Sequence, residues 1–267
     1  MPKVNYLIAA ADHRIGRPQS DFRVDGADIL KLHLRELRKT DLSKLSQVTI
    51  LRITQSGEKE SCISSYWDVE EQIKDFGCPV VMLDIKHECL SYGAWVRAVQ
   101  KYQEEFDYYI IIEDDYYPVL HNFVEVLTSL HNRLLPNGGY LNSLTACKWA
   151  AISNGIIDSA TFLRAIKKVK DPIEFISKEP QVRFSYLFAP LLDDYLDFYR
   201  SLFMRYEGTI LWEEYRDGSA QNKQDIFNPI EYLVQSKMNF PKNKWDKVVW
   251  NDNIMDSIKD VLSEYII

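Results

Sequence analysis

The segment Asp107–Pro118 constrains the fold of this chain more than any other. It holds five consecutive apolar or aromatic residues, Tyr108–Ile112, followed directly by the carboxylates Glu113, Asp114 and Asp115. An unbroken apolar run is typical of a strand buried on both faces of a parallel sheet, because a half-exposed strand alternates with polar residues. The proline that closes the segment has no backbone donor and ends the pairing. The acids are therefore expected at the carboxyl end of a central strand, the edge where open α/β sheets bind ligands.

Three adjacent carboxylates repel one another unless a cation lies among them. Mg²⁺ and Mn²⁺ take hard oxygen ligands, often with only one or two protein carboxylates, and leave their other positions to water and substrate phosphates. The segment thus favours a metal-dependent diphosphate site. The alternative is a solvated acidic turn that caps the following helix.

Strands and helices alternate along the first half of the chain. Apolar runs predict strands at Val4–Ala11, Gln47–Thr54 and Pro79–Ile85, the last of them buried. Three helices are expected between the strands, with inward-facing residues Leu30, Leu34 and Leu37 in the first, Trp67, Ile73 and Phe76 in the second, and Trp95, Val99, Tyr102 and Phe106 in the third. This alternation predicts an α/β fold with a mostly parallel central sheet, right-handed crossovers and helices on both faces.

The two common glycine-rich phosphate cradles are absent. No Gly-x-Gly-x-x-Gly follows the first predicted strand, and no Gly-x-x-x-x-Gly-Lys-Ser/Thr occurs. A diphosphate bound without such a loop needs a metal, which the acidic strand end is placed to hold.

Residues at the ends of the other strands are candidates for binding a nucleotide sugar. Ala10, Asp12 and Arg14 close or follow the first strand, and Asp84 and His87 lie at the end of the third. Arginines in the loop after the first strand could reach a phosphate or be solvated, and a lone histidine is as often a surface residue as a ligand.

The second half of the chain is less regular. A strand is expected at Trp149–Ser153, a tight turn at Asn154-Gly155, a helix capped by Ser159 and a last strand at Gly208–Trp212. A helix begins at Pro190, and its first turns carry Asp193 and Asp194. Acids near a helix N-terminus are favoured by the macrodipole, so these two are either caps or catalytic groups.

Composition excludes several classes of protein. The net charge of −7 argues against a large nucleic-acid footprint. No window approaches the roughly eighteen apolar residues of a membrane helix, so no transmembrane segment is expected. Four cysteines without a Cys-x-x-Cys pair, and the lack of an Asn-x-Ser/Thr sequon, indicate a reducing, cytoplasmic setting and no zinc site.

The order of these elements resembles the GT-A glycosyltransferase fold. Around the Glu-Asp-Asp motif the chain is most similar to the N-acetylglucosaminyltransferase I family, in which a hydrophobic strand also ends in Glu-Asp-Asp and is followed by a proline and a Phe-containing helix. The resemblance covers Ser91–Leu127, and more loosely Gly155–Arg200. It implies a single GT-A-like domain, with a nucleotide-sugar-binding half at 1–117 and an acceptor-binding half at 118–267.

The resemblance also implies roles for individual residues. Asp115 would bind the divalent metal, Mn²⁺ or Mg²⁺, together with Glu113. Glu113 and Asp114 would lie near the ribose and sugar of the donor. The Asp193-Asp194-Tyr195 sequence corresponds to the family's Asp-Asp-aromatic motif, so Asp194 would be the catalytic base.

The function expected from the sequence is metal-dependent transfer of a sugar from a nucleotide-diphosphate donor to a hydroxyl of a glycan or glycoconjugate acceptor. The course would be inverting with Asp194 as base, whereas a retaining course stays open if Asp194 is a cap. Two alternatives remain: a sugar-1-phosphate nucleotidyltransferase, against which the region 9–17 offers one glycine and no lysine, and a non-catalytic nucleotide- or glycan-binding module.

Overall fold

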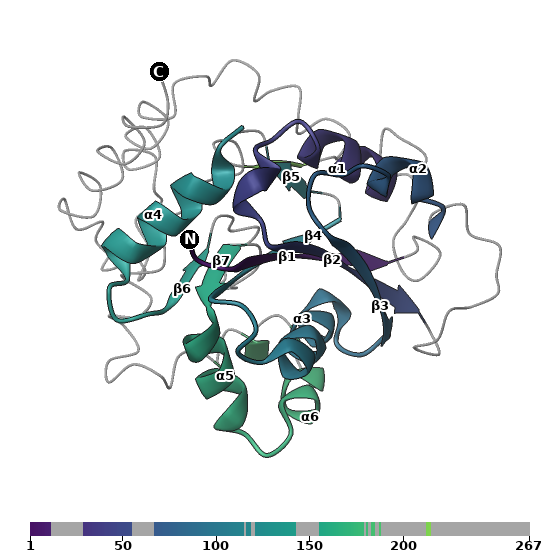
Figure 1. Ribbon diagram of the computed structural model, residues 1–267. Helices are drawn as coiled ribbons and strands as arrows, with labels where there is room; N and C mark the ends of the chain where they lie inside the picture. The colour runs from purple at the N-terminus through teal and green to yellow at the C-terminus, as the bar shows by residue number, and fades with distance from the viewer. Residues whose placement is uncertain are drawn as a thin grey trace, which may run out of the picture.

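The computed structural model describes residues 1–11, 29–54, 67–114, 116–118, 121–142, 155–178, 180, 183–184, 187 and 212–214. Its centre is a six-stranded sheet in the order β3-β2-β1-β4-β7-β6, covered by helices on both faces (Figure 1). The predicted α/β class, a mostly parallel sheet flanked by helices, is confirmed.

The first four strands in this order pair with their neighbours in parallel, whereas β7 and β6 are joined by antiparallel pairing. The parallel strands are β1 (Val4–Ala11), β2 (Gln47–Thr54), β3 (Val80–Lys86) and β4 (Tyr108–Glu113). β7 (Gly155–Asp158) runs antiparallel to β4, and β6 (Tyr140–Asn142) antiparallel to β7. β5 (Tyr116–Pro118) and β8 (Trp212–Glu214) form a separate antiparallel pair. The mixed pairing begins where the chain enters its second half.

The helices divide between the two faces of the sheet (Figure 1). One face carries α1 (Ile29–Leu37), α2 (Glu70–Ile73) and α4 (Phe123–Leu134). The other carries α3 (Leu90–Tyr102), α5 (Ser159–Lys167) and α6 (Pro172–Ser177). A short 3-10 helix, Leu42–Lys44, precedes β2. None of the helices in these described ranges is long and apolar enough to cross a membrane.

The core follows the expected periodicities. Leu30, Leu34 and Leu37 of α1 are fully buried, as their spacing predicts. The run Tyr109–Ile112 of β4 is fully buried as well, because helices cover this central strand on both faces. Trp95 of α3 is equally inaccessible and packs edge-to-face on Tyr92.

Three expectations about individual elements were wrong. The third strand, β3, is a half-exposed edge strand in which only Leu83 is buried, because the four-residue α2 covers little of it. Gly155 is not in a turn but begins β7. Asp158, rather than Ser159, caps α5 by accepting a hydrogen bond from the Thr161 N–H. Of the strand expected at Gly208–Trp212, only Trp212 lies within the described residues, and it belongs to β8. The strand expected at Trp149–Ser153 lies outside the described residues.

Candidate functional site

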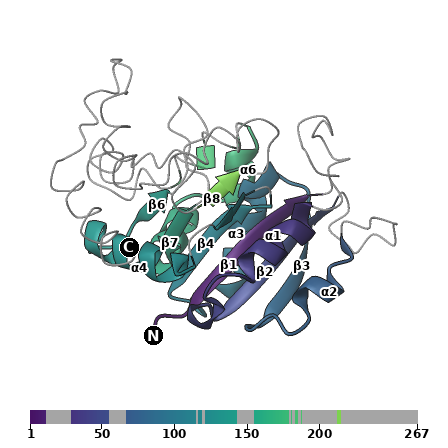
Figure 2. The same cartoon turned by 90° about the horizontal axis from the view of Figure 1, so that it is seen from above.

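The order of the strands changes direction at the centre of the sheet. From β1 the chain moves to β2 and β3 on one side, and then returns to β4 on the other side of β1 (Figure 2). Ala9 of β1 lies opposite Glu113 of β4 at the carboxyl ends of the two strands. A ligand crevice in an open α/β sheet forms at such a switch point. The predicted acidic segment therefore starts at the edge where a ligand is expected.

Glu113 is held on the side of the sheet that α3 covers. The Ser91 hydroxyl, in the first turn of α3, donates a 2.8 Å hydrogen bond to Glu113 Oε1. Burial raises the pKa of Tyr140 well above its usual value, and the nearby Tyr92 and Glu113 add to the rise. Glu113 itself is half-buried, so its carboxylate is oriented by the protein at the edge of the sheet.

Asp114 is turned toward the backbone of β1. Its side chain is buried, and Oδ2 accepts a 3.1 Å hydrogen bond from the Ala11 N–H. Its own N–H donates to the Ala9 carbonyl at 3.1 Å. Asp114 thus ties the end of β4 to the end of β1, a contact that sequence periodicity does not reveal. Its expected place near the donor sugar stays a prediction.

The bond from Ala11 to Asp114 gives a prediction for stability. Asp114→Ala is expected to lower the free energy of unfolding by about 2 kcal/mol, because it leaves a part-buried N–H without its acceptor. Asp114→Asn keeps an acceptor oxygen in the same place and is expected to cost about half as much. Urea unfolding followed by circular dichroism measures both. Equal stability of the alanine variant and the parent would show that the bond contributes nothing.

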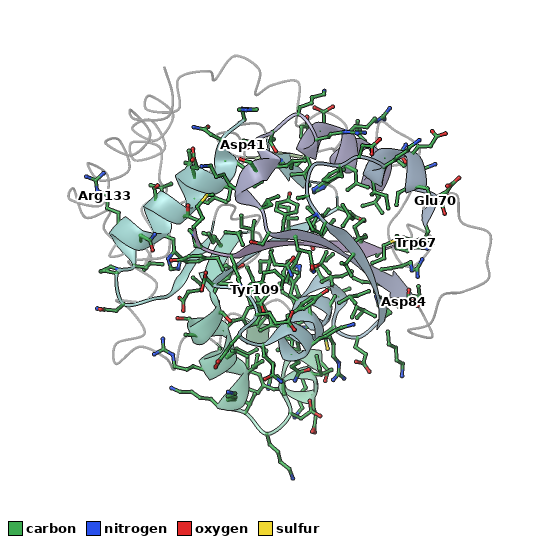
Figure 3. The ribbon with its side chains drawn as sticks, in the orientation of Figure 1. Asp41, Trp67, Glu70, Asp84, Tyr109 and Arg133 are labelled. Atoms are coloured by element: carbon green, nitrogen blue, oxygen red, sulfur yellow. The ribbon has the colours of Figure 1, made fainter. Side chains whose placement is uncertain are left out.

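A second group of side chains gathers where β2 and β3 end. Arg52 lies opposite Ala10 on one side and Asp84 on the other, and it forms an ion pair with Asp84. Its guanidinium also lies over the Trp67 ring, 5.9 Å from the centroid. Figure 3 shows Trp67 and Asp84 close together on the β3 side of the sheet. Arg52 is buried, whereas Trp67 and Asp84 reach the surface.

The other predicted residues of this edge differ in accessibility. Ala10 is fully buried in β1. His87 is half-buried just beyond β3, and its N–H donates to the Thr54 carbonyl at 2.7 Å. Sequence reasoning missed Arg52 and Trp67 as site residues. The available indication was a charged residue within the apolar run of β2, which is costly unless it is paired.

Several predicted site residues cannot be placed. Asp12, Arg14, Asp115, Asp193 and Asp194 lie outside the described residues. Within the described ranges, no three His, Cys, Asp or Glu side chains come close enough together to hold a metal ion. The donor set that the sequence offers at the switch point, the carboxylates of Glu113 and Asp115, still fits Mg²⁺ or Mn²⁺ in its chemistry, because these cations use hard oxygens and need only one or two carboxylates.

Comparison with known proteins leaves the family open. No protein-family model and no curated protein matches the chain. Among solved structures, it is similar to a cytidylyltransferase from Leptospira borgpetersenii serovar Hardjo-bovis, with 15% identity, coverage of 99% of this chain and 97% of the other, and a TM-score of 0.48.

Two further solved structures are similar over less of the chain. One is a UDP-glucose pyrophosphorylase complexed with UDP-glucose, which is 11% identical in sequence. The match covers 72% of this chain and 87% of the pyrophosphorylase chain, with a TM-score of 0.39. A CMP:2-keto-3-deoxy-manno-octonic acid synthetase complexed with CTP has 13% identity, 69% and 86% coverage, and a TM-score of 0.37. None of these three is named as a glycosyltransferase, and the resemblance to N-acetylglucosaminyltransferase I stays a prediction. At TM-scores below 0.5, the matches establish no activity for this chain.

Proposed function

We propose that this protein is a metal-dependent transferase that binds a nucleotide-linked sugar at the carboxyl ends of β1 and β4 and transfers its glycosyl group. The observation that carries the proposal is the start of the acidic segment at the switch point of the sheet, with Glu113 opposite Ala9. Clefts of this kind place a phosphate-bearing ligand beside the strand ends.

The nucleoside part of the donor would lie toward β2 and β3. Trp67 offers a partly accessible aromatic face for stacking, and Asp84 offers a carboxylate that accepts hydrogen bonds from a base or a ribose. Arg52 would keep the Asp84 carboxylate in place through their ion pair. These three side chains, with His87 nearby in the chain, give the site a polar and aromatic wall.

The diphosphate would lie against the acidic segment. Glu113, oriented by Ser91, and Asp115 would hold Mg²⁺ or Mn²⁺. When bound, the metal would stabilise the negative charge that develops on the departing nucleoside diphosphate. Asp114 would keep the ends of β1 and β4 together through its bond to Ala11, so that Glu113 stays at the edge of the crevice.

The acceptor side of the reaction would use Asp194. In the inverting course, the acceptor hydroxyl oxygen bonds to the anomeric carbon while the bond from that carbon to the diphosphate oxygen breaks. The hydroxyl proton passes to the Asp194 carboxylate, which acts as general base. Asp193 would support the same site.

Nucleotidyl transfer to a sugar 1-phosphate is the second candidate. One of the similar solved structures is named as a cytidylyltransferase. What favours it in this chain is the sequence after β1, which carries Arg14, Arg17 and Arg23. Guanidinium groups bind phosphate oxygens in pairs and could neutralise a triphosphate.

Product analysis separates these functions. We expect the protein with Mn²⁺ to release nucleoside diphosphate from one member of a panel of UDP-, GDP- and dTDP-sugars, with or without an added sugar acceptor, and to stop when EDTA removes the metal. Release of pyrophosphate from a nucleoside triphosphate and a sugar 1-phosphate would instead establish nucleotidyl transfer. If ligands raise the melting temperature but neither product forms, the protein is a binding module; a ligand at a hundred times its Kd adds about 2.7 kcal/mol.

A further inference from the structure

A buried hydrogen-bonded chain connects α1 to the acidic segment. His33 of α1 is 1% exposed, and its Nδ1 lies 3.1 Å from the backbone carbonyl oxygen of Asp114. Its Nε2 lies 3.0 Å from the hydroxyl of Tyr6, a fully buried residue of β1. His33 belongs to α1, Tyr6 to β1, and Asp114 directly follows β4.

The Asp114 carbonyl fixes which nitrogen of the imidazole carries a proton. A carbonyl oxygen can only accept, so His33 Nδ1 carries the proton and donates it to Asp114. In the neutral ring Nε2 is then the acceptor, and the Tyr6 hydroxyl donates to it. Tyr6 is itself held by its ring, which packs edge-to-face on Phe123 of α4 at a centroid distance of 5.7 Å.

The carbonyl to which His33 donates a hydrogen bond belongs to Asp114, the middle residue of the sequence Glu113-Asp114-Asp115. Two more bonds hold the same residue: its N–H donates to Ala9, and its carboxylate accepts from Ala11. Asp114 follows Glu113 directly, so the three bonds that hold its backbone and side chain also fix the end of β4 that carries Glu113. A buried donor aimed at this carbonyl therefore acts on the geometry of the Glu113 carboxylate.

We propose that His33, oriented by Tyr6, is a positioning residue that holds the Asp114 backbone and so keeps the Glu113 carboxylate in the geometry that binds a divalent cation. The metal-binding part of this inference rests on the proposed function. The hydrogen bond from His33 to Asp114 does not depend on that function, and it is tested without any substrate.

Two amide variants test the roles of the two imidazole nitrogens one at a time. The side-chain amide of His33→Asn reaches the place of Nδ1 and keeps a donor for the Asp114 carbonyl, whereas that of His33→Gln reaches the place of Nε2 and keeps only the partner of Tyr6. Tyr6→Phe removes the hydroxyl but keeps the ring packed on Phe123. A purely space-filling role would not distinguish asparagine from glutamine in this order.

Two measurements test the proposal on the full chain. Amide hydrogen exchange reports the bonds of Ala11 and Asp114 directly, and electron paramagnetic resonance of free Mn²⁺ reports metal binding without a nucleotide. In His33→Gln we expect exchange at these two amides to rise about tenfold, as the loss of one buried hydrogen bond implies, and the Kd for Mn²⁺ to rise by about the same factor. His33→Asn is expected to stay close to the parent in both, and Tyr6→Phe to lie between the two variants.

Other results would overturn the proposal. If His33→Gln leaves the Ala11 and Asp114 amides as protected as in the parent, or if exchange rises equally at Ile50 in the centre of β2, His33 only fills space. If exchange at those two amides rises in His33→Gln but Mn²⁺ binding is unchanged, the proposed positioning of the Glu113 carboxylate is disproved. If His33→Gln weakens Mn²⁺ binding as expected but the parent protein turns over no nucleotide sugar, the positioning role is supported and the proposed function is rejected.

Discussion

Asp115→Ala is expected to lower metal-dependent transfer by about a thousandfold, roughly 4 kcal/mol of transition-state stabilisation. Asp115 directly follows Asp114, the buried aspartate that bonds to Ala11, and is the predicted principal ligand of the cation. Without it, Glu113 would be the only remaining carboxylate of the proposed pair, and the charge on the departing diphosphate would be poorly neutralised. The free energy of unfolding is expected to change little, because removing one of three adjacent carboxylates relieves their mutual repulsion.

The measurement is the rate of nucleoside diphosphate release at saturating Mn²⁺, with urea unfolding as the check on stability. Asp107→Ala is the matched control, since Asp107 is an exposed aspartate just before the other end of β4, where it accepts a bond from the Lys3 N–H. The control should keep the parent's activity. Full activity in Asp115→Ala would remove Asp115 from the site, and an equal loss in Asp107→Ala would mean that the effect is not local.

Gly93→Ala is expected to destabilise the protein by about 3 kcal/mol. In an ordinary helix position this substitution stabilises, because alanine has the better helix propensity by about 1 kcal/mol. At Gly93, however, the added Cβ would lie 1.9 Å from the backbone carbonyl oxygen of Glu88. Cys89 and Leu90 between them have positive φ angles of 61° and 58°, so the chain already folds back tightly over the first turn of α3. The backbone there must shift to accept a methyl group.

The effect of Gly93→Ala should extend to the candidate site. Ser91, which donates to Glu113, lies between the crowded backbone and Gly93. We therefore expect weaker Mn²⁺ binding together with lower stability. Urea unfolding measures the loss of stability, and Lys101→Ala on the exposed side of the same helix is the control, expected to stay within about 0.5 kcal/mol of the parent. A Gly93→Ala variant as stable as the parent would mean that the start of α3 relaxes without cost.

Local patterns predicted much of the parallel sheet. The expected bounds of β1 and β2 agree with the structure, because apolar runs of about eight residues have few alternatives to a buried strand. The three leucines of α1 are buried as their spacing requires. β3 was misjudged because an apolar run does not reveal whether a strand is central or at an edge. That depends on which other segments pair with it.

The candidate site was predictable only in part. Adjacent acids after a buried strand indicated its location, and the switch point between β1 and β4 agrees with it. The sequence could not distinguish Glu113, held at the edge by Ser91, from Asp114, which is buried against Ala11. Arg52 and Trp67 were missed because they belong to different segments of the chain and meet only in the folded protein.

The amino-acid sequence by itself determined which segments form strands and helices, since periodicity and apolar runs act over a few residues. It also determined that carboxylates follow the central strand. The tertiary structure decided how each side chain is used: which carboxylate braces the backbone, that Arg52 pairs with Asp84, and that His33 reaches Asp114. These partners are far apart in the chain, from 32 residues for Arg52 and Asp84 to 103 for Ala11 and Asp114. Such contacts depend on the packing of whole elements, which no local pattern encodes.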